Sequence, residues 1–114
     1  MKADQFEDII AWQKAKTLTF EIYTAFKLCR DLSFKNQIER ASISIMNNIA
    51  EGYERQTNKD FRNFLYIAKG SCAEVRSMLS VAEGLGYIPL QSQQRLSQQA
   101  IEISKILSGF IKTL

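Results

Sequence analysis

The stretch FKNQIERASISIMNNIAEGYE, residues 34–54, has the apolar spacing of a long amphipathic helix. At 100° per residue, apolar side chains three and four positions apart fall within one arc about 80° wide. An arc of this kind packs against neighbouring helices. The residues that form this first arc are Phe34, Ile38, Ala41, Ile45 and Ile49.

A second apolar arc lies on a different side of the same predicted helix. A helix at the edge of a monomeric bundle needs one apolar side, so a second side predicts contact with another copy of the chain. The alternative is that this arc touches a neighbouring helix of the same bundle. The predicted interface residues are Ile43, Met46, Ala50 and Tyr53.

Helical periodicity extends over most of the remaining sequence. Asp8 is an acceptable N-cap for a first helix, Asp31 or Ser33 for the second, and Thr57 for the third. Short connections place successive helices antiparallel. The sequence therefore predicts a single all-α domain, an antiparallel up-down-up-down four-helix bundle with helices over residues 8–29, 34–54, 59–85 and 90–113.

The composition narrows the possible functions. The 114 residues are 46% hydrophobic and 24% charged, and they include no histidine. Histidine is the commonest general base and metal ligand, so zinc sites, di-iron sites and histidine-dependent triads are excluded. Phosphate-binding glycine motifs are missing as well. We expect a non-enzymatic protein without metal or cofactor, and a carboxylate pair such as Glu51 with Glu74 is a weak alternative.

The two cysteines and the uncharged segments carry no signal for secretion or membrane insertion. Cys29 and Cys72 are far apart in the sequence and resemble reduced, packed thiols. The longest uncharged run, residues 84–94, contains glycine, glutamine and proline, so it is not a membrane span. These features predict a cytoplasmic protein that does not contact a membrane.

The third predicted helix carries a row of cations. Arg62, Lys69 and Arg76 recur at seven-residue intervals, close to two helical turns, on a chain with net charge +3. Such a row can follow the phosphates of RNA or DNA while a tyrosine stacks on a base. The alternative is a solvated face paired with nearby carboxylates. The predicted nucleic-acid-binding residues are Lys59, Arg62, Tyr66, Lys69 and Arg76.

Gly70, in the interior of the same helix, costs about 1 kcal/mol relative to alanine. We expect this cost to be offset by the close approach of another helix or of another subunit at this position.

Two runs resemble the signature of a known bacterial family. QIERASISIMNNIAEG (residues 37–52) and FRNFLYIAKGS (residues 61–71) are similar to the bacterial four helix bundle proteins, also called the 23S rRNA intervening-sequence protein family. The resemblance continues through AWQKA (residues 11–15) and GYI (residues 86–88) to the C-terminal helix. Members often carry proline between the first two helices, where this chain has Cys29-Arg30-Asp31, a departure that affects loop shape only.

The resemblance implies a bundle that assembles into a ring-like homopentamer. Some members are encoded within intervening sequences of 23S rRNA genes. A related branch, the accessory variability determinant of diversity-generating retroelements, is a basic pentamer that engages reverse transcriptase and nucleic acid. For most members no biochemical activity is established. The family's polar positions map onto Gln37, Arg40, Ser44, Asn48, Glu51, Arg55, Ser71 and Glu74, which we interpret as a network between helices or subunits.

The sequence therefore favours an oligomeric adaptor that contacts RNA or DNA through its basic helix face. The alternative hypothesis is a scaffold that binds a protein partner and no nucleic acid.

Overall fold

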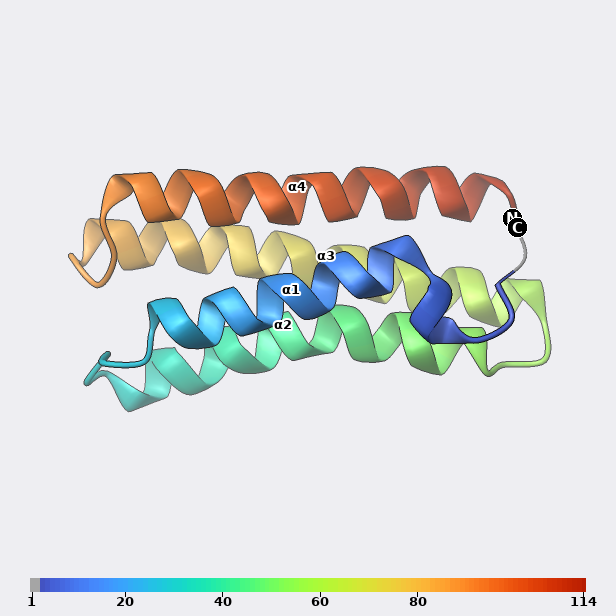
Figure 1. The fold of residues 1–114 in the computed structure, drawn as a ribbon, viewed down its shortest axis with the longest axis horizontal. Coiled ribbons are helices and arrows are strands. Elements are labelled where there is room, and N and C mark those ends of the chain that lie inside the picture. Colours follow the sequence, from blue (N-terminus) through green and yellow to red (C-terminus); the bar gives the residue numbers. More distant parts are fainter. Residues whose placement is uncertain (1–2) are drawn as a thin grey trace.

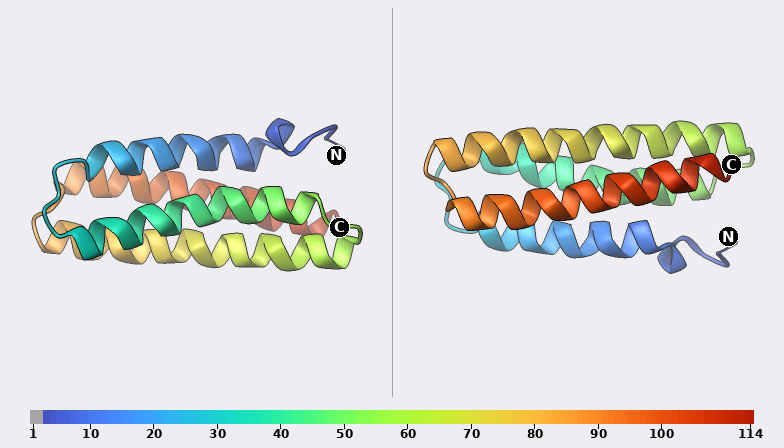
Figure 2. Two further views of the ribbon diagram at one scale, coloured as in Figure 1. Left: turned by 90° about the horizontal axis from the view of Figure 1, so that it is seen from below. Right: turned by 90° about the horizontal axis from the view of Figure 1, so that it is seen from above.

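The computed structural model describes residues 3–114 and shows the predicted all-α architecture. The antiparallel up-down-up-down bundle is confirmed: α1 packs between α2 and α4, and α3 packs between the same two helices (Figures 1 and 2). The molecule measures 43 × 21 × 19 Å, and both termini lie at one end of its long axis (Figure 1). The elements are η1 (Phe6–Asp8), α1 (Ile10–Ala25), α2 (Leu32–Tyr53), α3 (Asn58–Gly84) and α4 (Leu90–Lys112).

The first helix is shorter than the periodicity predicts. Asp8 is not its N-cap, because residues 6–8 form a separate 3-10 turn and Ile9 follows in an extended conformation. This break directs the Ile9 side chain toward the core, where it is buried. At the other end, α1 stops at Ala25, and the loop that follows still buries Phe26 completely. Apolar spacing continues past both helix ends because loop residues also contribute to the core.

The starts of α2 and α3 are fixed by side-chain hydrogen bonds, and the end of α3 by the backbone conformation of a glycine. The Asp31 carboxylate accepts a hydrogen bond from the Phe34 N–H at 3.1 Å, and the Thr57 hydroxyl accepts one from the Asp60 N–H at 3.1 Å. Each therefore satisfies an amide at the start of its helix. Beyond α3, Gly86 adopts a φ of +76°, the left-handed conformation that glycine tolerates best.

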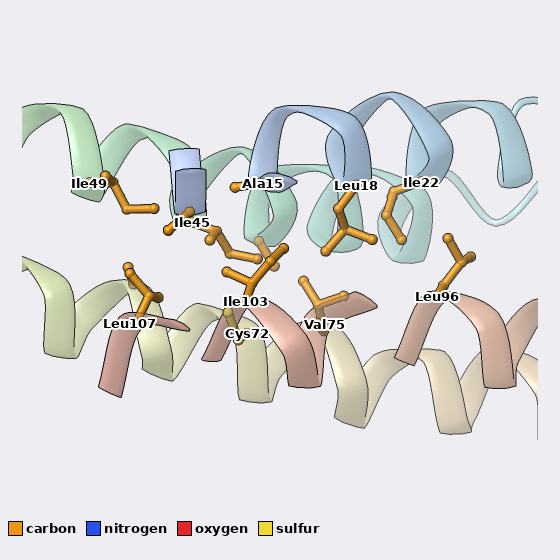
Figure 3. Packing of buried hydrophobic residues seen from close by; sticks show 14 of the residues in the cluster. Ala15, Leu18, Ile22, Ile45, Ile49, Cys72, Val75, Leu96, Ile103 and Leu107 are labelled. Carbon is orange, nitrogen blue, oxygen red and sulfur yellow. The ribbon is translucent and has the colours of Figure 1, made fainter. Parts of the chain in front are cut away.

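The core is a continuous apolar column along the bundle axis. Side chains from all four helices point toward one another in its central part (Figure 3). A side chain of this kind contributes about 1.5–3 kcal/mol when it is fully buried, so the column is the main source of stability. The largest fully buried helical side chains are Leu18, Ile22, Ile38, Ile45, Ile49, Leu65, Leu79, Leu96, Ile103 and Leu107.

The close approach predicted at Gly70 occurs instead at Gly52. A Cβ atom added to Gly52 would lie 2.6 Å from the Phe64 Cβ and 3.0 Å from the Phe61 Cδ1. A Cβ added to Gly70 would meet no atom of the described chain within 4 Å, because this residue is on the exposed side of α3. The prediction for Gly70 within the bundle was therefore wrong, since helical position alone does not specify which residue faces a neighbour.

The two connections at the end opposite the termini are joined by a side-chain hydrogen bond. The Tyr87 hydroxyl donates to the Asp31 carboxylate at 2.7 Å, and the Tyr87 ring packs edge-on against Phe34. Hydrogen bonds from Tyr87 and from the Phe34 amide lower the pKa of Asp31 below its ordinary value of 3.8. The same bond raises the pKa of Tyr87.

Replacing Tyr87 with phenylalanine is expected to lower the Tm most near neutral pH. The folded-state pKa of Asp31 lies below its unfolded value, so its contribution is complete above a pH of about 3.8 and disappears as the pH falls through the folded-state pKa. The Tm difference between wild type and Tyr87→Phe should therefore narrow under acid conditions. Thermal unfolding between pH 2.5 and 7 measures this, with Tyr23→Phe as control; a pH-independent difference would contradict it.

None of the helices in residues 3–114 is both long enough and apolar enough to cross a membrane.

Candidate nucleic-acid interface

Two of the cations on α3 contact α4 or the residues that follow it. The Lys69 ammonium donates to the Ser108 hydroxyl at 2.6 Å, and the Arg62 guanidinium donates to the main-chain oxygen of Leu114, the last residue of the sequence. Arg76, two turns further along α3, is exposed on the same side. We call Arg62, Lys69 and Arg76 the basic face. Its length along α3 is about 21 Å at 1.5 Å per residue.

No aspartate or glutamate side chain within residues 3–114 forms an ion pair with the basic face. The ion pairs among residues 3–114 join Lys14 to Glu102, Arg55 to Glu51 and Arg95 to Glu21. All three pairs use cations outside the basic face, and none uses Lys59, which is exposed in the first turn of α3. The alternative interpretation pairs these cations with nearby carboxylates, but Asp60, Glu74 and Glu83 form no ion pair in the described structure.

Two lysines of α4 add to this surface, and the sequence analysis missed them. Lys105 and Lys112 precede and follow Ser108 by three and four residues, so they share its side of α4. Both are exposed. Their seven-residue spacing is visible in the sequence, but only the contact between Lys69 and Ser108 shows that they border the basic face.

Tyr66 is an exposed aromatic residue within this row of cations. Its side chain is 58% exposed, so its ring is open to solvent on α3 between Arg62 and Lys69. A solvent-accessible ring beside cations is an arrangement on which single-stranded bases stack.

Three of the predicted network residues join α2 to α3. The Ser71 hydroxyl donates to the Ser44 Oγ at 2.9 Å, and the Asn48 amide donates to the Ser44 Oγ at 2.9 Å and to its carbonyl oxygen at 2.8 Å. This cluster is half-buried or buried and connects facing helix surfaces. It fixes the lateral position of the two helices, a structural role.

The other predicted network residues are separate from this cluster. Glu51 pairs with Arg55 one turn away at 3.6 Å, and the Arg55 guanidinium stacks on the Phe64 ring at 4.7 Å. Gln37, Arg40 and Glu74 are exposed, and in the described part of the chain their side chains make no hydrogen bond or ion pair. The eight residues therefore do not form one network within a single chain.

Groups capable of covalent or metal chemistry are sparse in this structure. Burial raises the pKa of the Cys72 thiol to about 12, despite the nearby cations Lys69 and Arg76, so the reactive thiolate is disfavoured. Residues 3–114 contain no cluster of three or more metal-ligating side chains.

Two residues of the second apolar side of α2 make contacts within the bundle, although all four are half-buried. Met46 packs against the core, where its sulfur lies 3.7 Å from the Thr19 hydroxyl of α1. Tyr53 packs edge-on against Phe61, with ring centroids 6.1 Å apart, and its hydroxyl donates to the Ala3 carbonyl oxygen. For these two residues the alternative that the sequence left open, contact within the same bundle, is the arrangement observed.

Ile43 lies at the edge of a different apolar surface. It is half-buried and shares a shallow depression with Tyr23 of α1. One turn before Tyr23, Phe20 is 62% exposed on the outside of α1. Ala50 is half-buried on α2. Phe20 and Tyr23 were not predicted as interface residues, although both lie outside the buried side of α1.

Comparison with known proteins identifies a matching family and solved structures with a similar fold. A family model described as "23S rRNA-intervening sequence protein" matches residues 7–109. A solved structure of a protein of unknown function from the S23 ribosomal protein family of Bacteroides thetaiotaomicron superimposes with a TM-score of 0.83. The two chains are 27% identical over 90% of this chain and 99% of the other. The comparison with curated proteins finds no significant match.

Proposed function

Because the chain belongs to the 23S rRNA-intervening sequence protein family, we propose that it is a non-enzymatic oligomeric adaptor that binds nucleic acid. The basic face would contact phosphates of RNA or DNA, together with Lys59, Lys105 and Lys112 at its edges. The observation that carries this proposal is that no aspartate or glutamate side chain within residues 3–114 forms an ion pair with Lys59 or with the basic face.

Cations left without carboxylate partners are available to replace the counterions that surround a nucleic acid. Each phosphate they neutralise releases condensed counterions, so the affinity falls as salt rises. Binding of this kind depends little on base sequence. Lys69 is oriented by its hydrogen bond to Ser108, and the donated bond leaves the ammonium two further N–H groups for a phosphate oxygen.

A salt titration of the wild-type protein tests the proposal. Fluorescence anisotropy with a labelled 20-nucleotide RNA should show binding at 50 mM salt and a linear decrease of log affinity with log salt concentration. No binding at 50 mM salt would contradict the proposal.

The second candidate function is a scaffold that binds a protein partner. It is favoured by apolar side chains on the outside of α3 and beyond its end, where Ile67, Val81 and Leu85 are each at least half exposed. A partner recovered with the protein after complete nuclease digestion would support this function over nucleic-acid binding.

Self-association, with the pentamer implied by the resemblance, is also part of the proposal. Met46 and Tyr53 pack against the core of their own bundle, and we place the contact between copies at the apolar surface of Phe20, Tyr23 and Ile43. Isolated apolar side chains are common on protein surfaces, but three neighbouring ones are typical of an interface.

Replacing Ile43 with aspartate is expected to lower the oligomeric state while helix content is retained. A charge at this half-exposed site would be unpaired and desolvated in an interface, yet hydrated in the monomer. Light scattering should show wild type at five times the 13.1 kDa chain mass and the variant at a lower multiple. Phe20→Asp should also give a lower mass than wild type. Ile67→Asp on α3 is the control and should keep the wild-type mass. Unchanged mass in both variants would exclude this surface.

A further inference from the structure

A polar groove between α3 and α4 continues the basic face toward the end of the bundle that lies opposite the termini. It is formed by the second half of α3 and the first half of α4, which run side by side in Figures 1 and 2. Its volume is about 590 Å³, within the roughly 300–1,000 Å³ typical of small-ligand sites. The polar residues along it that matter here are Arg76, Ser77, Ser80, Gln94, Ser97 and Gln98.

The groove combines a single cation with many neutral polar groups. Serine hydroxyls and glutamine amides can both donate and accept hydrogen bonds, and Arg76 supplies a fixed positive charge. The residues lining this groove include no carboxylate. Such a site suits a ligand that carries one anionic group next to uncharged donors and acceptors. A nucleotide, with its phosphate and its base edge, has this combination.

From this groove we infer that the protein binds single-stranded nucleic acid, with one nucleotide seated between the two helices. The inference rests on the proposed function and specifies its ligand. The Arg76 guanidinium contacts the phosphate of this nucleotide, while the amides of Gln94 and Gln98 hydrogen-bond to the edge of its base. The adjoining strand follows Lys69 and Arg62 along α3.

The neutral part of the groove is what distinguishes a single strand from a duplex. In duplex RNA the bases are paired, and the deep major groove keeps their edges out of reach of side chains. A duplex would meet this surface with phosphates and sugars, so the glutamine amides would find no base edge to read. An unpaired strand can turn a base into the groove and place the next one near Tyr66, whose ring is exposed for stacking.

The test compares two forms of RNA on two matched variants. Fluorescence anisotropy is measured with 12-nucleotide oligouridylate and oligoadenylate, and with an RNA duplex of the same length whose G–C pairs keep it double-stranded under the assay conditions. The groove variant is Gln94→Ala with Gln98→Ala, both exposed on α4, where alanine favours the helix. The control is Gln5→Ala with Gln56→Ala, two exposed glutamines outside the groove.

Wild type should bind at least one single strand about tenfold more tightly than the duplex. The groove variant should lose about tenfold in that affinity, as expected for two hydrogen bonds, and change duplex binding less than twofold. The control should match wild type. Circular dichroism verifies that both variants are folded.

Equal affinity for single strand and duplex would overturn the inference, as would a groove variant that binds like the control. Either result leaves the proposed function intact if RNA binding is still salt-sensitive. Failure of every probe to bind at 50 mM salt would instead remove the proposed function together with the inference.

Discussion

Alanine at Gly52 should destabilise the bundle by about 1–2 kcal/mol, whereas alanine at Gly70 should stabilise it by up to about 1 kcal/mol. The two substitutions add the same methyl group, Gly52→Ala in the last turn of α2 and Gly70→Ala in the middle of α3, and both favour the helix. They differ in what the methyl group meets. At Gly52 it would lie 2.6 Å from the Cβ of Phe64, and at Gly70 it would meet no atom of residues 3–114 within 4 Å.

The contact at Gly52 is not easily relieved. The Phe64 Cβ is attached directly to the α3 backbone, so the helices must separate to admit the new methyl group. Separation would loosen Phe61, which packs edge-on against both Tyr53 and Phe110. This loss outweighs the propensity gain of about 1 kcal/mol that alanine brings.

Chemical denaturation of the two variants at one protein concentration measures both effects, because oligomerisation would make stability depend on concentration. Destabilisation by Gly70→Ala would show that another chain approaches α3 at Gly70. Stabilisation by Gly52→Ala would mean that α2 and α3 are not in close contact there.

Reversing the charge of Arg62 and Lys69 together should reduce the affinity for single-stranded RNA by about 25-fold or more at 0.1 M salt. Each phosphate contact to a single strand contributes about 0.7 to the slope of log affinity against log salt, so two lost contacts lower the slope by about 1.4. The glutamates of Arg62→Glu with Lys69→Glu add repulsion to this loss. Anisotropy titrations between 50 and 200 mM salt give both quantities.

The matched control is Lys27→Glu with Arg30→Glu, which makes the same change in net charge at exposed sites near the end of α1. Its salt slope should stay close to that of wild type. If both double variants weaken binding equally, attraction depends on net charge and the basic face has no special role.

The sequence alone was sufficient for the bundle because apolar periodicity and capping are local properties. The spacing of Ile38, Ile45 and Ile49 gives α2 one continuous apolar side, whichever helix covers it. Thr57 and Gly86 mark the two ends of α3 through hydrogen bonding and backbone conformation within a few residues. The row of cations on α3 also follows from spacing along one helix.

Contacts between helices were decided only by the tertiary structure. These contacts are the hydrogen bond between Lys69 and Ser108, the close packing of α3 at Gly52 and the packing of Met46 against α1. Each depends on the axial register and rotation of two packed helices. Helical periodicity gives the angle of a residue around its own axis, but the neighbour that residue meets depends on how the whole core packs.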